Sequence, residues 1–127
     1  MVFRLLPAIL WKEAIERLKH ISVNDANYLA AQKLLANYQA NLGMVESKLK
    51  AERESGEALD RANVQIANLL ASASNDAKGG NRDRSISQIQ TIINQLGKVQ
   101  KGTTAYPEAQ ELIQSAQGKL KQLKSQK

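Results

Sequence analysis

The chain has 127 residues, a net charge of +6, no cysteine and only 4% aromatic residues. The lack of cysteine excludes disulfides, thiolate metal sites and cysteine nucleophiles. Alanine, leucine, glutamine, lysine and glutamate are abundant and favour helix, so the composition predicts an all-α protein with a core of leucine, isoleucine and alanine.

The first predicted helix covers residues 7–21. One apolar face is formed by residues at helical spacing, namely Trp11, Ala14, Ile15, Leu18 and Ile21, and Pro7 is expected in the first turn. The apolar segment at the start of the chain is too short to span a bilayer and lacks the order of a signal peptide. We therefore expect no membrane-spanning segment and favour a cytoplasmic or membrane-peripheral location.

A long second helix is predicted over residues 25–73, with Asn24 or Asp25 as its N-cap. Its apolar positions alternate spacings of 3 and 4 residues, which is the heptad seam of a coiled coil or a helical hairpin. Gly43 lies off the seam and is interpreted as an internal glycine, whereas a kink at Ser55–Gly56 is left open. The seam consists of Leu35, Tyr38, Leu42, Val45, Leu49, Glu52, Gly56, Leu59, Asn63, Ile66, Leu70 and Ala73.

Two shorter helices complete the chain. Residues 72–83 cluster serine, asparagine, aspartate and glycine, and they are predicted to form a loop. The third helix is expected over residues 84–100, with Gly102 as its stop signal. The fourth is expected to begin at Thr103 or Thr104 and to continue to the lysine-rich end of the chain.

Residues 11–42 align with residues 89–120 without a gap, at an offset of 78 residues (89 − 11), and 8 of the 32 positions are identical. The match includes the connecting loop and the tyrosine after it, which a shared helix-forming composition does not explain. We interpret the two segments as copies of one helical hairpin, in which alanine allows close approach of the helices and tyrosine fills the turn. The predicted packing residues are Trp11, Ile15, Leu18, Tyr28, Ala31, Tyr38, Ile93, Leu96, Tyr106 and Ala109.

The motif Tyr-x-x-Ala, at residues 28–31 and 106–109, resembles the second helix of tetratricopeptide (TPR) repeats. The run over residues 11–38 is more closely similar to the degenerate TPR-like hairpins common in cyanobacterial proteins. The usual glycine of the first TPR helix is missing, and the second copy lacks the tryptophan and the later tyrosine of the first. The resemblance implies a scaffold that binds other proteins, and it assigns no ligand-binding residue.

These elements predict a single elongated unit of four helices, with two TPR-like hairpins joined through the long helix. The first hairpin is expected over about residues 7–50, and the second half of the long helix is expected to pack with the second hairpin over about residues 57–125. Apolar stripes left exposed by this arrangement would favour association, so a homodimer is one possible assembly.

No catalytic arrangement is evident. His20 is the single histidine and has no cysteine partner, so it does not indicate a metal site. Gly79–Gly80 lacks both the preceding strand and the Lys-Ser/Thr ending of a phosphate-binding loop. We therefore expect no enzymatic activity, no metal and no cofactor.

The excess positive charge lies in residues 77–127, because residues 1–76 carry equal numbers of basic and acidic side chains. Lysines near helix ends suit the helix dipole, and no aromatic residues interleave with them, so nucleic-acid binding is not favoured. The expected function is a non-enzymatic protein–protein interaction or assembly scaffold. The alternative is a basic adaptor that docks on an anionic membrane or nucleic acid through residues 78–127. Its candidate residues are Lys78, Arg82, Arg84, Lys98, Lys101, Lys119, Lys121 and Lys124.

Overall fold

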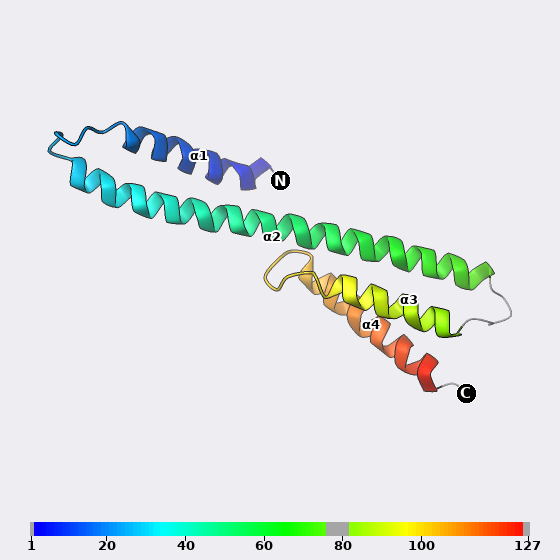
Figure 1. Ribbon diagram of the computed structural model, residues 1–127. Helices are drawn as coiled ribbons and strands as arrows, with labels where there is room; N and C mark the ends of the chain where they lie inside the picture. Colours follow the sequence, from blue (N-terminus) through cyan, green and yellow to red (C-terminus); the bar gives the residue numbers. More distant parts are fainter. Residues whose placement is uncertain (1, 76–81, 126–127) are drawn as a thin grey trace. The chain divides into compact units, whose positions relative to one another are not determined.

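A computed structural model describes residues 2–75 and 82–125, and over these ranges the chain is all-helical (Figure 1). The helices are α1 (Val2–Lys19), α2 (Tyr28–Asn75), α3 (Arg82–Leu96) and α4 (Tyr106–Ser125). This confirms the predicted all-α fold with four helices. The chain divides into two compact units, Met1–Lys50 and Ala51–Lys127, so that α2 contributes to both.

Helix α1 begins at Val2, and the prediction that placed Pro7 in the first turn was therefore wrong about its start. A proline removes one hydrogen bond to the carbonyl four residues earlier, and here the helix continues on both sides of that missing bond. The helix ends at Lys19, before Ile21, because the hydrogen bonds that follow span three residues instead of four. The N–H groups of His20 and Ile21 donate to carbonyls three residues earlier, at 3.3 Å each.

Helix α2 is continuous through Gly43 and through Ser55–Gly56, so the chain has no break at either place. It begins at Tyr28, later than predicted, because the carboxylate of Asp25 accepts a hydrogen bond from the N–H of Asn27 at 2.8 Å and holds a turn before the helix. The predicted loop over 72–83 is shorter than expected, since α2 extends to Asn75 and α3 begins at Arg82. Residues 76–81, which include Gly79–Gly80, lie outside the described residues.

The residues of the predicted seam of α2 are half-buried as far as Leu59 and again at Ile66. Asn63 and Leu70 are exposed, although the seam placed them inside. The fully buried positions in this part of α2 are Ser55, Ala58 and Ala62, which lie off the seam. A straight helix has 3.6 residues per turn, so a repeat of 3.5 drifts by about 20° in each heptad. The packed face of α2 in unit 2 therefore combines small buried residues with the seam residues Leu59 and Ile66, which pack against the core. The side chain of Ala73 lies outside the described residues.

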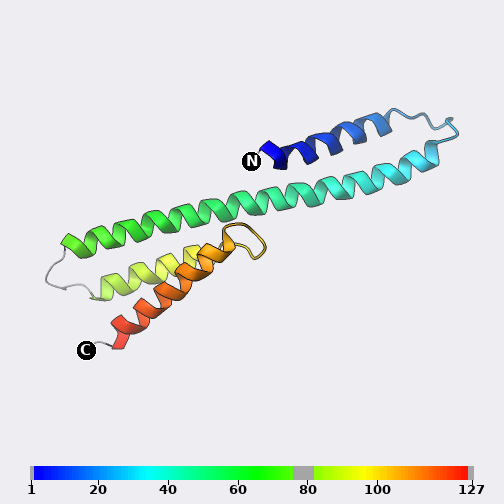
Figure 2. The same cartoon turned by 180° about the vertical axis from the view of Figure 1, so that it is seen from behind.

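Unit 2 is a three-helix unit with a continuous core. Both views show α3 and α4 beside the later turns of α2 (Figures 1 and 2). Small side chains of α2 allow this approach, while α3 contributes the large ones. The core residues are Ala58, Ala62, Ile92, Leu96, Val99 and Ala109.

Unit 1 has two helices in its described part, and α1 runs back along the first turns of α2 (Figure 1). Its core is thin, because two helices can bury only one stripe each. Ala8, Ile15 and Ala31 are buried, whereas the other described apolar residues of the hairpin are half-buried or exposed. No described helix in either unit is both long enough and apolar enough to cross a membrane.

Candidate interaction surfaces

The turns of the two hairpins have the same backbone hydrogen bonds at the 78-residue offset. Three N–H groups donate across each turn, and donors and acceptors correspond one to one. In unit 1 the bonds are Asp25 to Ser22 (3.0 Å), Tyr28 to Asp25 (3.1 Å) and Ala31 to Asn27 (2.9 Å). In unit 2 they are Thr103 to Gln100 (3.3 Å), Tyr106 to Thr103 (3.2 Å) and Ala109 to Ala105 (3.0 Å). The alignment of the two sequence segments therefore corresponds to a repeated local structure. We call residues 2–50 hairpin 1 and residues 82–125 hairpin 2.

The predicted packing residues of hairpin 1 lie between its two helices. The rings of Trp11 and Tyr38 meet edge to face, with centroids 4.9 Å apart and an interplanar angle of 64°. Ile15 and Ala31 are buried, while Leu18 and Tyr28 are half-buried with the two aromatic rings. This hairpin is thus held by one aromatic pair and a short aliphatic stripe.

Among the predicted packing residues of hairpin 2, Leu96 is more deeply covered than its equivalent in hairpin 1, whereas Ile93 is less covered than Ile15. Leu96 and Ala109 are fully buried in the core of unit 2, and Tyr106 packs against that core. Ile93 is half-buried. The equivalent residues of hairpin 1 for Leu96 and Tyr106 are Leu18 and Tyr28. Leu96 is fully buried whereas Leu18 is half-buried, because a third helix, the later part of α2, covers hairpin 2.

This third helix also holds the turn of hairpin 2 through two polar side chains. The Oγ atom of Ser55 is fully buried and accepts a hydrogen bond from the N–H of Gln100 at 2.9 Å. The carboxylate of Glu52 accepts bonds from the N–H and the hydroxyl of Thr104, at 2.8 and 2.7 Å. Sequence reasoning missed both roles and considered a break at Ser55. The sequence feature that could have indicated a packed helix face here is the series of small residues Ser55, Ala58 and Ala62 at helical spacing.

The turn of hairpin 1 is instead held by its own side chains. The carboxylate of Asp25 accepts the N–H of Asn27, and the hydroxyl of Ser22 accepts the N–H of Asn24 at 3.3 Å. These bonds satisfy the turn locally, so hairpin 1 forms without a covering helix in the described part of unit 1.

The face of hairpin 2 that meets α2 has an open equivalent on hairpin 1. Ile92 and Val99 pack in the core with the alanines of α2 and are nearly inaccessible. Their equivalents on α1 and just after it, Ala14 and Ile21, are only half-buried. The same helical surface is therefore covered in one copy and accessible in the other.

Two leucines extend this accessible surface. Gln88 lies beside α2 in a shallow groove of about 250 Å³ that Gln65 also lines. One residue before the aligned segment, at the same offset, hairpin 1 has Leu10, which is 62% exposed. Leu112 packs against the core of unit 2, and its equivalent Leu34 is 43% exposed. We define the open face of hairpin 1 by Leu10, Ala14, Ile21 and Leu34.

Exposed hydrophobic side chains concentrate in unit 1. Of the eight large ones in the described ranges, six belong to this unit. These six are Ile9, Leu10, Val23, Leu29, Leu34 and Met44, and the two in unit 2 are Val64 and Leu70. Contiguous exposed apolar surface is typical of interaction sites, whereas single exposed residues are ordinary.

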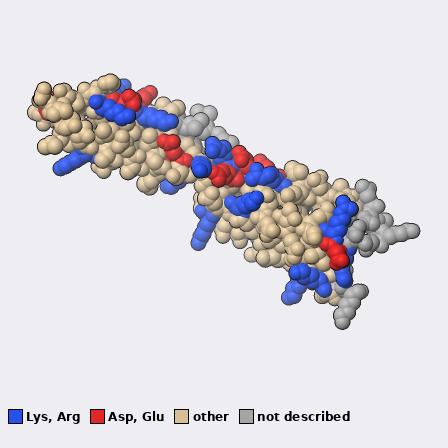
Figure 3. All heavy atoms as spheres, in the orientation of Figure 1, with Lys and Arg blue, Asp and Glu red and all other residues tan. Residues whose placement is uncertain are grey.

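The described candidate basic residues form two groups at opposite ends of hairpin 2. Lys98 and Lys101 lie at its turn. The other group combines the start of α3 with the end of α4 and consists of Arg82, Arg84, Lys119, Lys121 and Lys124. Lys78 lies outside the described residues. On the visible face, basic and acidic side chains are interspersed (Figure 3), so the predicted residues do not form one uniform patch.

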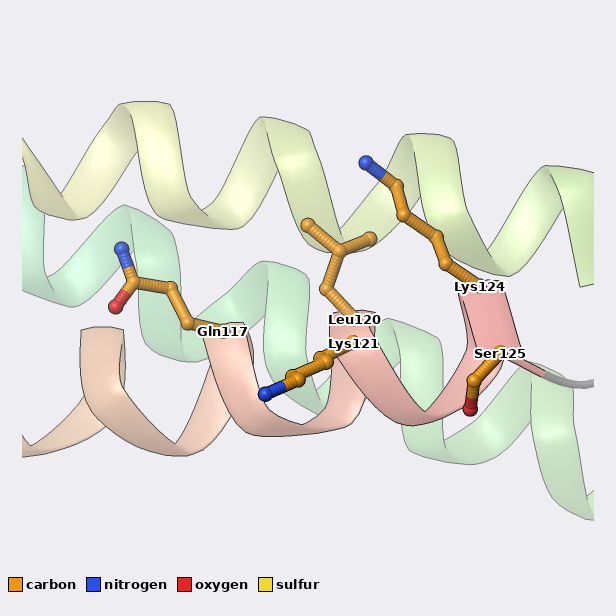
Figure 4. Close-up of a pocket in the computed structure, with 5 residues that line it drawn as sticks. All are labelled: Gln117, Leu120, Lys121, Lys124 and Ser125. Atoms are coloured by element: carbon orange, nitrogen blue, oxygen red, sulfur yellow. The ribbon is translucent and has the colours of Figure 1, made fainter.

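An open hollow of about 440 Å³ lies at the end of α4. Leu120 and Lys124 point to one side of the helix and Lys121 points to the other (Figure 4). A leucine between two lysines offers one apolar contact beside positive charge. A single helix end of this kind is compatible with surface docking but does not enclose a ligand.

The described ranges were also compared with the requirements of a metal site. No cluster of three or more histidine, aspartate or glutamate side chains there could hold a metal ion. His20 is exposed just after α1. Comparison of the chain with family models, with curated proteins and with solved structures gave no match.

Proposed function

We propose that the chain is a non-enzymatic protein–protein interaction or assembly module, and that the open face of hairpin 1 is its main binding surface. The observation that carries the proposal is the difference between the two hairpins. One copy has a helix on this face, and the other presents exposed leucines at the equivalent positions. The resemblance to TPR-like hairpins supports the same function.

The exposed leucines supply a driving force for binding. Complete burial of a leucine side chain contributes about 1.5–3 kcal/mol. Leu10 is 62% exposed and Leu34 is 43% exposed, so a binding partner that covers both gains about 2 kcal/mol from these side chains alone. The polar positions around them provide the rim that a specific interface needs.

The proposal is tested by capture of binding partners on the immobilised chain at about 0.5 M salt, where charges are screened beyond about 4 Å. Retention of partners by the unmodified chain and their loss with Leu10→Asp would support it. The matched control is Leu70→Asp, which introduces the same charge at a residue of unit 2 that is 64% exposed. Equal capture by both variants would contradict the proposal.

The second candidate function is a membrane-peripheral or nucleic-acid adaptor, and the basic group near the end of α4 favours it. Lys121 and Lys124 are exposed beside Leu120. Binding to anionic vesicles or heparin at low salt, with loss at about 0.5 M salt, would support this function. The double variant Lys121→Glu/Lys124→Glu should then weaken binding, and Lys98→Glu/Lys101→Glu at the other end of hairpin 2 is the control.

A further inference from the structure

We infer that the open face of hairpin 1 binds the same face of a second copy of the chain, so that two hairpins form a four-helix interface about a twofold axis. The inference rests on the proposed function, because it names the partner for the same surface. It makes the chain an assembly module whose first partner is itself.

Hairpin 2 shows what this surface accepts. There, a helix lies along α3 and brings small side chains, Ala58 and Ala62, against Ile92. The later part of α2 is already engaged in this way within unit 2. Among the described residues, the exposed large hydrophobic side chains lie mostly on hairpin 1. A second copy presents the same exposed hydrophobic side chains on its own hairpin 1.

The charges beside the open face are self-complementary. Glu13 and Arg17 lie one turn apart on α1 and are exposed, and among the described residues neither takes part in an ion pair. A twofold interface requires that residue i meets residue j while residue j meets residue i. An antiparallel pair of α1 helices places Glu13 of each copy opposite Arg17 of the other, which satisfies this requirement twice.

The same register suits the apolar residues. When the twofold axis passes midway between Glu13 and Arg17 or slightly beyond, Leu10 of one copy lies across from Ile21 of the other. Ala14 then lies near the axis, where a small side chain lets two helices approach closely. Apolar contacts thus form at both ends of the α1 pair, with the opposite charges between them.

The inference is tested by sedimentation of Glu13→Arg and Arg17→Glu, each alone and as an equal mixture. The unmodified chain should dimerise, and each variant should raise the dimer Kd by about tenfold because it places like charges across the axis twice. The mixture should recover dimers that contain one chain of each variant, since both contacts across the axis then join an arginine of the first variant to a glutamate of the second. A change in the stability of α1 within one chain cannot be restored by mixing.

Leu10→Asp supplies a second test on a side chain that is already accessible, so the fold should be retained, and circular dichroism verifies this. It should raise the dimer Kd by about 100-fold, because two copies each lose a buried leucine. Leu70→Asp should leave the Kd unchanged. A monomer at every concentration reached, or no recovery in the charge mixture, would overturn the inference. If that monomer still captured another protein through Leu10, the proposed function would stand without the dimer. If Leu10→Asp dimerised and captured partners normally, both would fall.

Discussion

Replacement of Ser55 by alanine tests whether the later part of α2 anchors the turn of hairpin 2. The change removes one oxygen atom from a fully buried side chain and leaves the packing volume nearly the same. It deletes the side-chain acceptor that the N–H of Gln100 uses, at 2.9 Å. The effect therefore isolates a single hydrogen bond between α2 and a residue 45 positions away.

The expected loss follows from two opposing contributions. A buried N–H group left without an acceptor costs about 1–3 kcal/mol, and the lower half of that range applies because Gln100 is accessible to water. Alanine is a better helix former than serine by about 0.5 kcal/mol. The net loss in the free energy of unfolding should therefore be about 1 kcal/mol.

Urea denaturation followed by circular dichroism measures this loss, with Ser115→Ala as the matched control. Ser115 is exposed on α4 of the same unit, so its replacement should gain only the helix-propensity term of about 0.5 kcal/mol. The two variants should then differ by about 1.5 kcal/mol. If Ser55→Ala were as stable as Ser115→Ala, the anchor would contribute nothing and the reasoning would be refuted.

Four further substitutions test other parts of the fold by the same denaturation assay. Gly102 has a φ of +90°, so Gly102→Ala should lose about 1 kcal/mol or more, although its Cβ would meet no atom. Gly43 lies inside α2 with open space around an added Cβ, so Gly43→Ala should raise the free energy of unfolding by about 0.5–1 kcal/mol. If both glycine replacements stabilised the fold, or both destabilised it, the account would be contradicted. Tyr38→Leu removes the ring contact with Trp11 and should lower the free energy of unfolding by about 1 kcal/mol. It should also shift the fluorescence emission of Trp11, the single tryptophan, and unchanged emission would argue against the contact. Leu96→Ala should cost about 3 kcal/mol, because this side chain is fully buried, and a loss below about 1 kcal/mol would place it outside the core.

Local features of the fold could be predicted from the sequence. The helices follow from periodic apolar residues and from turn signals that act within a few residues. Helix boundaries were less accurate, as at Val2, because a proline can be accommodated within a helix when the turns around it are hydrogen-bonded. The seam of α2 was correct at Leu59 and Ile66, which pack against the core of unit 2, but it failed at Asn63 and Leu70, which are exposed because a repeat of 3.5 residues drifts around a straight helix.

Features that depend on distant contacts could not be predicted. Glu52 and Ser55 bind backbone groups 52 and 45 residues away, and no local pattern distinguishes them from other polar residues of a helix. Leu10 and Leu34 look like ordinary core leucines in the sequence. Only the comparison of the two hairpins in three dimensions shows that one copy leaves these positions open. The repeat itself was visible in the sequence, but its consequence required the structure.

Disulfide formation by the double variant Leu10→Cys/Ile21→Cys tests the central claim most directly, because the chain has no other cysteine. Within one chain the two residues are separated by about 16 Å along the helix, whereas a disulfide requires Cα atoms within about 7 Å. The account predicts that mild oxidation yields a covalent dimer in high yield, well above that of the exposed single variant Leu70→Cys. A yield no greater than that of Leu70→Cys would contradict the assembly of two chains through the open face of hairpin 1.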